Sequence, residues 1–123
     1  MNTYVPLWVK SNHSFLEGAS SPEELVERAH ALGLPAVAIT DRDGVYGLVR
    51  AQMRAKELGV RIVTGAQLMV EVEGHAHHVV ALAKTRSGYA NLCRVLSLGH
   101  ARCEKGSSLI HGEELDPLHG LFF

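Results

Sequence analysis

The chain has 123 residues, of which 46% are hydrophobic and 20% are charged, and its formal net charge is -1. These values are typical of one globular domain and exclude a whole-chain basic field or a long acidic tail. They do not exclude DNA as a partner of a larger enzyme. No stretch approaches the ~20 apolar residues of a membrane span, and no secretion signal is recognisable. With only Cys93 and Cys103, we expect reduced thiols, a cytoplasmic location and no membrane partner.

The first elements are an expected strand, a loop and a capped helix. Tyr4–Val9 alternates apolar residues and predicts a strand. Ser21 and Glu24 form a capping-box pattern, with a proline at the first helical position between them. Gly33 stands where a helix ends.

A second unit of the same kind follows. Leu34–Thr40 is almost entirely apolar, which indicates a strand buried on both faces, as in a parallel sheet. After a turn, a helix is expected over Val45–Leu58, closed by Gly59, and then a strand over Val60–Val70. The apolar face expected for this helix consists of Val45, Leu48, Val49 and Ala55.

The two units echo each other, because "ALGLPAVAIT" and "ELGVRIVTGA" begin 26 residues apart, at Ala31 and Glu57. Both read as a helix end, a glycine and an apolar strand. That rhythm predicts β/α units rather than a sandwich.

The second half is less regular. "EVEG" (Glu71–Gly74) is a weak strand candidate, His77–Ala83 a stronger one, and Ser87–Leu98 is expected to be helical. The apolar face of this helix would consist of Tyr89, Leu92, Val95 and Leu96. Gly112–Phe123 suggests a short helix that leads into a strand. Because the chain stops on two phenylalanines in that strand, we expect residues 1–123 to be the N-terminal portion of one larger domain.

In a β/α barrel, chemistry is located in the loops after the strands. Three such places are Lys10–Gly18, Asp41–Gly44 and Gly65–Gln67. Asp41 and Asp43 could form a metal-binding pair, but the favoured alternative is that they shape the turn. The eight histidines are more simply explained as surface and loop residues.

Four linked segments carry a family resemblance. They are "KSNHSFLEGASSPEEL", "LPAVAITDRDGVYG", "ELGVRIVTGAQ" and "VVALAKTRSGYANLCRVLSLG". Their order and spacing resemble the PHP domain that opens the alpha subunit of bacterial C-family DNA polymerases, in particular the error-prone branch. The resemblance covers essentially the whole chain. It implies an α/β fold, a partial distorted β/α (TIM-like) barrel with mostly parallel strands.

Active members of this family hold a cluster of metal ions with histidines and carboxylates and hydrolyse phosphoesters. The family's opening H-x-H pair falls on Trp8 and Lys10, neither of which can replace an imidazole ligand. The carboxylate that follows falls on Glu17, a plausible substitute for aspartate.

Three further ligand positions can be placed in the same way. The histidine after "TD" falls on Arg42, adjacent to Asp41, and the glutamate of the third strand falls on Gln67. The next histidine is retained as His78. Only Glu17 and His78 could still bind a metal, and two positions are now cationic. We therefore expect a degenerate site without metal-dependent activity.

The substituted residues suggest other roles. Trp8 could fill the vacated pocket, and Lys10 or Arg42 could pair with Glu17 or Asp41, so that a salt bridge replaces the metal. For His77 and His78, the simpler interpretation is one partly buried and one exposed side chain. Cys93 is expected near the core rather than as a nucleophile, and Ser14 has no recognisable histidine partner for nucleophilic catalysis.

The resemblance implies a segment of an error-prone DNA polymerase, whose parent enzyme adds nucleotides on damaged templates. The segment itself would be inactive and structural. Its partners would be the remainder of the polymerase subunit and, through the parent, DNA. No cofactor is expected in the segment, although the parent could use a divalent metal. The alternatives are a stand-alone phosphoesterase resembling histidinol phosphatase and a non-catalytic PHP binding module.

Overall fold

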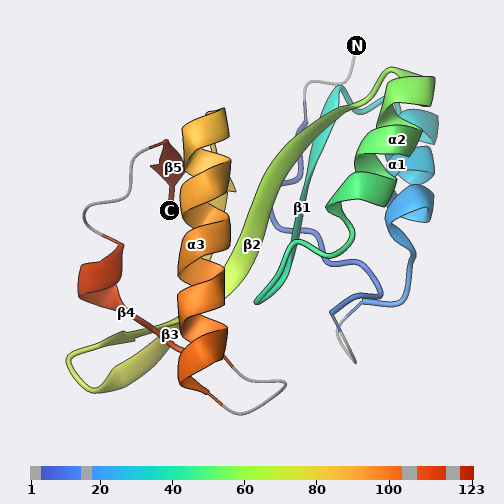
Figure 1. The fold of residues 1–123 in the computed structure, drawn as a ribbon. Coiled ribbons are helices and arrows are strands. Elements are labelled where there is room, and N and C mark those ends of the chain that lie inside the picture. The colour runs from blue at the N-terminus through green and yellow to red at the C-terminus, as the bar shows by residue number, and fades with distance from the viewer. Residues whose placement is uncertain (1–3, 15–17, 104–107, 116–119) are drawn as a thin grey trace.

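The computed structural model describes residues 4–14, 18–103, 108–115 and 120–123 (Figure 1). Its elements follow the expected order in the first half and add a hairpin in the second. They are α1 (Pro22–Ala31), β1 (Ala36–Arg42), α2 (Leu48–Leu58), β2 (Arg61–Val72), β3 (His75–Ala83), α3 (Arg86–Arg102), β4 (Ile110–His111), the 3-10 helix η1 (Gly112–Glu114) and β5 (Leu121–Phe122).

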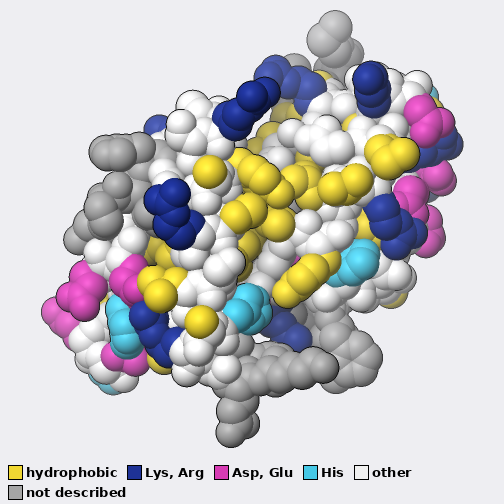
Figure 2. Space-filling view, viewed as in Figure 1, with side chains coloured by type: hydrophobic (Ala, Val, Ile, Leu, Met, Phe, Trp, Pro, Cys, Tyr) yellow, Lys and Arg dark blue, Asp and Glu magenta, His cyan; other side chains and the backbone are white. Residues whose placement is uncertain are grey.

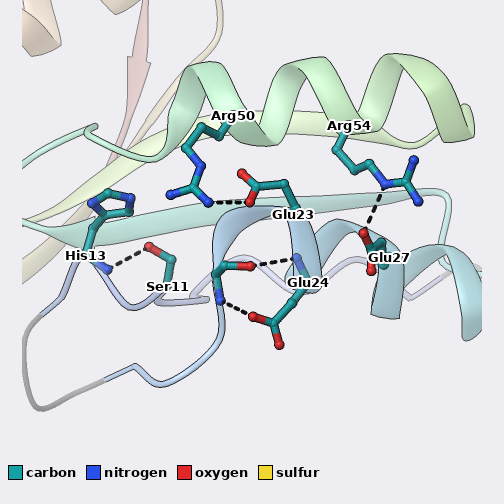
Figure 3. A network of polar contacts seen from close by, with 8 residues as sticks. Ser11, His13, Glu23, Glu24, Glu27, Arg50 and Arg54 are labelled. Carbon is teal, nitrogen blue, oxygen red and sulfur yellow. Dashed lines mark hydrogen bonds and ion pairs between the residues drawn. The ribbon is translucent and has the colours of Figure 1, made fainter.

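The predicted capping box of α1 is confirmed. The Ser21 hydroxyl accepts from the Glu24 amide, and the Glu24 carboxylate accepts from the Ser21 amide (Figure 3). Ion pairs join the two neighbouring helices, with Arg50 on Glu23 and Arg54 on Glu27. These pairs are exposed, so each contributes at most about 1 kcal/mol.

The sheet corrects the expectation of a mostly parallel barrel. β1 and β4 pair with β2 in parallel, but β2 with β3 and β3 with β5 are antiparallel. The described strands form an open mixed sheet in the order β1-β2-β3-β5, with β4 on β2. "EVEG" is not a separate strand. Glu73 and Gly74 both have positive φ, 52° and 79°, and form the two-residue turn of the β2–β3 hairpin.

All three helices cover one face of this sheet. Val37 and Ile39 of β1 pack with α1 and α2, while Ala66, Leu68 and Val70 of β2 pack with α3. The register places these positions on a common face, because alternate residues of a strand point the same way. In Figure 1, α1 and α2 lie together at one side and α3 at the other, and β2 is visible between them. The opposite face, which no helix of the described residues covers and which is called the helix-free face below, contains Thr40, Arg42, Gly65 and Gln67.

Two sequence expectations for local structure are wrong. Val49 is 69% exposed, and the residues of α2 that enter the core are Ala51 and Ala55. Tyr4–Val9 is not a full strand. It makes one parallel bridge, Val9 to Ile39, and backbone hydrogen bonds from Ala38 to Pro6 and from Thr40 to Val9.

Candidate functional site

The candidate site lies where β1 and β2 end and β3 begins. Arg42 pairs with Gln67 in the β1–β2 register, and Gln67 is diagonal to His78, which pairs with Met69. These three positions therefore share the helix-free face. The segment before the first loop brings Trp8 to the same place. Glu17 lies outside the described residues, so its role stays a prediction.

A short chain of hydrogen bonds links three of the predicted site residues. The Trp8 indole Nε1–H donates to Oε1 of Gln67 at 2.8 Å. Nε2 of Gln67 is 3.0 Å from Nδ1 of His78. Gln67 is only 2% exposed, so these two partners satisfy an amide that is otherwise removed from water.

The chemistry of the donors fixes the direction of each hydrogen bond between these three side chains. An indole can only donate, so Gln67 must present its oxygen to Trp8 and its NH2 group to His78. Nδ1 of His78 must then accept, which places the imidazole proton on Nε2. The Nδ1 lone pair of His78 is therefore already used by the Gln67 amide.

Trp8 does not fill a buried pocket, and that expectation is wrong. Its side chain is 64% exposed, and Nζ of Lys10 lies 5.6 Å from the ring centroid, a cation–π distance. His77 and His78 are both exposed, so the expected partly buried member is absent from this pair. The indole forms an open surface with a cation over it.

A second network holds Asp41 on the opposite, helix-covered face. Oδ1 accepts from the Ser11 amide and the Ser14 hydroxyl, and Oδ2 accepts from the Ser11 hydroxyl, each at 2.7 Å. The Arg42 amide donates to the Ser14 oxygen at 2.9 Å. Asp41, Ser11 and Ser14 are at most 2% exposed. Asp41 therefore ties the first loop to the end of β1, which extends the expectation that it shapes a turn.

The adjacent turn contains Asp43, whose φ of 54° lies in the left-handed region that aspartate tolerates better than most residues. Its amide donates to the Gln67 carbonyl at 2.8 Å, and Nε2 of His100 donates to its carbonyl at 2.6 Å. Burial raises the pKa of the Asp43 carboxyl above its ordinary value of 3.8, while His100 and Arg42 act in the opposite direction. Asp43 shapes the turn, and Asp41 and Asp43 serve separate networks.

The residues of the site do not fit a metal cluster. Among the described residues, no three histidine, cysteine, aspartate or glutamate side chains are grouped so that they could hold an ion. An indole, an ammonium, a guanidinium and an amide stand at the other positions where the resemblance predicts ligands, and two of these groups are cations. No catalytic step through a metal follows from this arrangement.

Ser11 and the structural role of Ser14 were missed by sequence reasoning, which weighed Ser14 only as a nucleophile. Their partner Asp41 is about 30 residues away along the chain, and no periodicity connects them. The polar character of "SNHS" is the one available signal, and polar loops are common. The partnership exists only because β1 and the first loop meet in the fold.

Comparison with known proteins identifies the family to which the chain belongs. The PHP domain family matches residues 7–117, and the chain belongs to this family. It is 49% identical over 105 residues to an error-prone DNA polymerase of Anaeromyxobacter sp. (strain K), covering 84% of this chain and 9% of that protein. It is 39% identical over 122 residues to the error-prone DNA polymerase of Pseudomonas fluorescens, covering 98% of this chain and 12% of that protein. The chain thus spans about a tenth of the length of these relatives.

Solved structures agree on the fold. An amidohydrolase from Chromobacterium violaceum, described with bound sulfate and no metal, aligns with a TM-score of 0.64 and 28% identity, over 77% of this chain and 32% of that one. A putative metal-dependent phosphoesterase from Bifidobacterium adolescentis aligns with a TM-score of 0.65 and 25% identity, over 81% and 34%. None of the described helices is long and apolar enough to cross a membrane.

Proposed function

We propose that this PHP domain is a structural, metal-free segment of an error-prone DNA polymerase. The observation that carries the proposal is the use of Gln67 and His78 in a closed hydrogen-bond chain with Trp8. A metal at His78 would need the Nδ1 lone pair that the amide already occupies, or Nε2, which carries the proton in this tautomer. A metal ion that bound at either nitrogen would first have to break the hydrogen bond to Gln67 or displace the proton on Nε2.

Electrostatics supports the same proposal. Lys10 and Arg42 stand at two family ligand positions, and each would repel a dication. Asp41, a buried carboxylate beside the site, is directed to Ser11 and Ser14 on the other face of the sheet. Under this proposal, hydrogen bonds rather than metal ions hold the loop before α1 against the end of β1.

The role in a polymerase rests on similarity to relatives of which this chain spans about a tenth. In the parent enzyme the domain would be a platform for the rest of the subunit, and templated nucleotide addition would belong to other segments. DNA would be a partner of the parent. Any divalent metal used in the reaction would bind elsewhere in that enzyme.

The test is metal stoichiometry in the purified chain. After incubation with Mn²⁺ or Zn²⁺ and gel filtration, we expect far less than one ion per chain and no metal-dependent hydrolysis of p-nitrophenyl phosphate. The matched control restores the family pattern with Trp8→His, Lys10→His, Arg42→His and Gln67→Glu, and this variant should retain more metal. Stoichiometric metal with phosphoester turnover in the unmodified chain would refute the proposal and favour the stand-alone phosphoesterase.

A further inference from the structure

A second surface of interest lies at the opposite end of the sheet. β1 and β2 run in parallel, so the candidate site is at their carboxyl ends and Ala36 and Arg61 are at their starts. Six residues separate Arg61 from Gln67 along β2, which is roughly 20 Å of extended chain. This end is therefore distinct from the candidate site.

A groove of about 530 Å³ opens there, between the start of β2, the end of β3 and the first turns of α3. Three of its lining residues are cations, Arg61, Lys84 and Arg86, and all three are exposed. No aspartate or glutamate is among the described residues that line it. In a chain with a net charge of -1, such a local excess of positive charge is notable.

The topology explains why these cations meet. Continuing the antiparallel β2–β3 register two residues beyond the Gly65–Leu82 pair sets Lys84 opposite Val63. Lys84 is held there, since its amide donates to the Gly120 carbonyl at 2.7 Å. Arg86 begins α3, and Arg61 begins β2. Three element ends thus bring the cations to one rim.

The space-filling view shows Lys and Arg side chains at this end and also at both flanks, where they lie beside acidic side chains (Figure 2). Dark blue Lys and Arg side chains gather at the upper end of the molecule, above the starts of α3 and β2. Below them an apolar furrow runs between α2 and α3, and the acidic side chains lie mainly at the two flanks. A polyanion that approaches this end meets positive charge first.

The first turn of α3 adds to the positive potential. Thr85 caps the helix through a hydrogen bond from the Gly88 amide to its hydroxyl, at 3.0 Å. The positive end of the dipole of this 17-residue helix is therefore directed toward the groove. Tyr89 lines the groove one turn further along and is half-buried, which provides an aromatic surface beside the cations.

We propose that this groove, defined by Arg61, Lys84, Arg86 and Tyr89, binds the phosphodiester backbone of single-stranded DNA. Several cations around one aromatic ring are the combination that single strands require, because phosphates pair with the cations and a base stacks on the ring. The choice of DNA among polyanions rests on the proposed polymerase role. The positive charge and the shape of the groove are observed independently of that role.

The test measures binding of a fluorescent oligothymidine to the purified 123-residue chain over a range of salt concentrations. Three phosphate contacts to a single strand give a slope of log K against log salt of about -2, so a tenfold rise in salt should weaken binding about 100-fold. The triple variant Arg61→Ala, Lys84→Ala and Arg86→Ala should bind weakly with a slope near zero. Tyr89→Ala should weaken binding with little change in slope.

The matched control removes three exposed cations elsewhere, Arg28→Ala, Lys56→Ala and Arg94→Ala, and so changes the net charge by the same amount. Circular dichroism verifies that each variant is folded. The proposal is overturned if the control loses as much binding as the groove variant, or if the unmodified chain does not bind oligothymidine at low salt. It is equally overturned if polyglutamate of matched charge binds the groove as tightly as DNA. Each of these outcomes leaves the metal measurement unaffected, so the two proposals fail separately.

Discussion

The two hydrogen-bond networks at the carboxyl ends of β1 and β2 differ in how deeply their side chains are buried. The Asp41 network is on the helix-covered face, and its serine partners are at most 1% exposed. The Gln67 network is on the helix-free face, and it ends on Trp8 at 64% exposure and on the exposed His78. Asp41 on β1 pairs with Ala66 on β2, and Gln67 is the next residue of β2, so its side chain points to the other face. The same strand ends thus provide a buried tie on one face and an open polar surface on the other.

The largest effect is expected from Asp41→Ala. It leaves one backbone and two hydroxyl donors buried without an acceptor, and each such donor costs about 1–3 kcal/mol, so the free energy of unfolding should fall by about 3–5 kcal/mol. Urea denaturation followed by the fluorescence of Trp8 measures this.

Asp41→Asn is the companion variant, since it keeps one acceptor oxygen and should lose less stability. If the alanine variant loses less than about 1 kcal/mol, the carboxylate does not tie the loop.

A smaller loss is expected from Gly18→Ala, which tests the same loop without touching Asp41. A Cβ at residue 18 would lie 2.2 Å from the Ser11 carbonyl oxygen, so the backbone that presents Ser11 must move. Such overpacking costs about 1–3 kcal/mol. Ala19→Ser, at the exposed neighbour, is the control for the same thermal melt. Equal melting temperatures for the two variants would show that the loop backbone can move to accommodate the added Cβ without loss of stability.

On the open face, Gln67→Leu should cost no more than about 1 kcal/mol. It removes the partners of Trp8 and His78, but water can reach both and replace the lost bonds. The same urea titration provides the measurement. A loss as large as that of Asp41→Ala would contradict the contrast between the two faces.

The smallest effect is a pH dependence at Asp43, which joins the two strand ends through its amide. Its folded-state pKa is raised by burial, so the folded protein holds this proton more tightly than the unfolded chain. The stability it contributes is present below its ordinary pKa and is lost as pH rises through the raised value. Asp43→Asn suits the left-handed backbone and cannot ionise.

The melting temperature of Asp43→Asn relative to the unmodified chain should therefore increase between about pH 3 and pH 7. A difference that stays constant or shrinks over this range would show that the carboxyl is not destabilised by burial.

The sequence predicts the first half of the fold well because its signals are local. The capping box at Ser21 and the glycine stops at Gly33 and Gly59 are confirmed, and both glycines have left-handed φ. The β2–β3 hairpin was missed because Glu-Gly is a weaker turn signal than Asn-Gly, although both residues adopt positive φ.

Side-chain roles were harder to predict because they depend on which faces meet. The core positions of α2 are alanines, whose short side chains give little hydrophobic signal. Ala55 was expected on the apolar face and is confirmed, but Ala51 was missed and Val49 was wrongly included. Trp8 was expected to be buried filler because of its size, yet it lies on a face that no described helix covers. For Ser11 and Ser14, only the meeting of the first loop with β1 reveals a function.

The central claim is that Nδ1 of His78 accepts a hydrogen bond from Gln67, at a position where the family resemblance implies a metal ligand. Two-bond ¹H–¹⁵N correlation NMR of the histidine rings tests this directly, with and without one equivalent of Zn²⁺. We expect His78 as the Nε2–H tautomer, with ring nitrogen shifts that do not change on addition of the metal. A proton on Nδ1, or a Zn²⁺-dependent shift of either ring nitrogen of His78, would contradict the account.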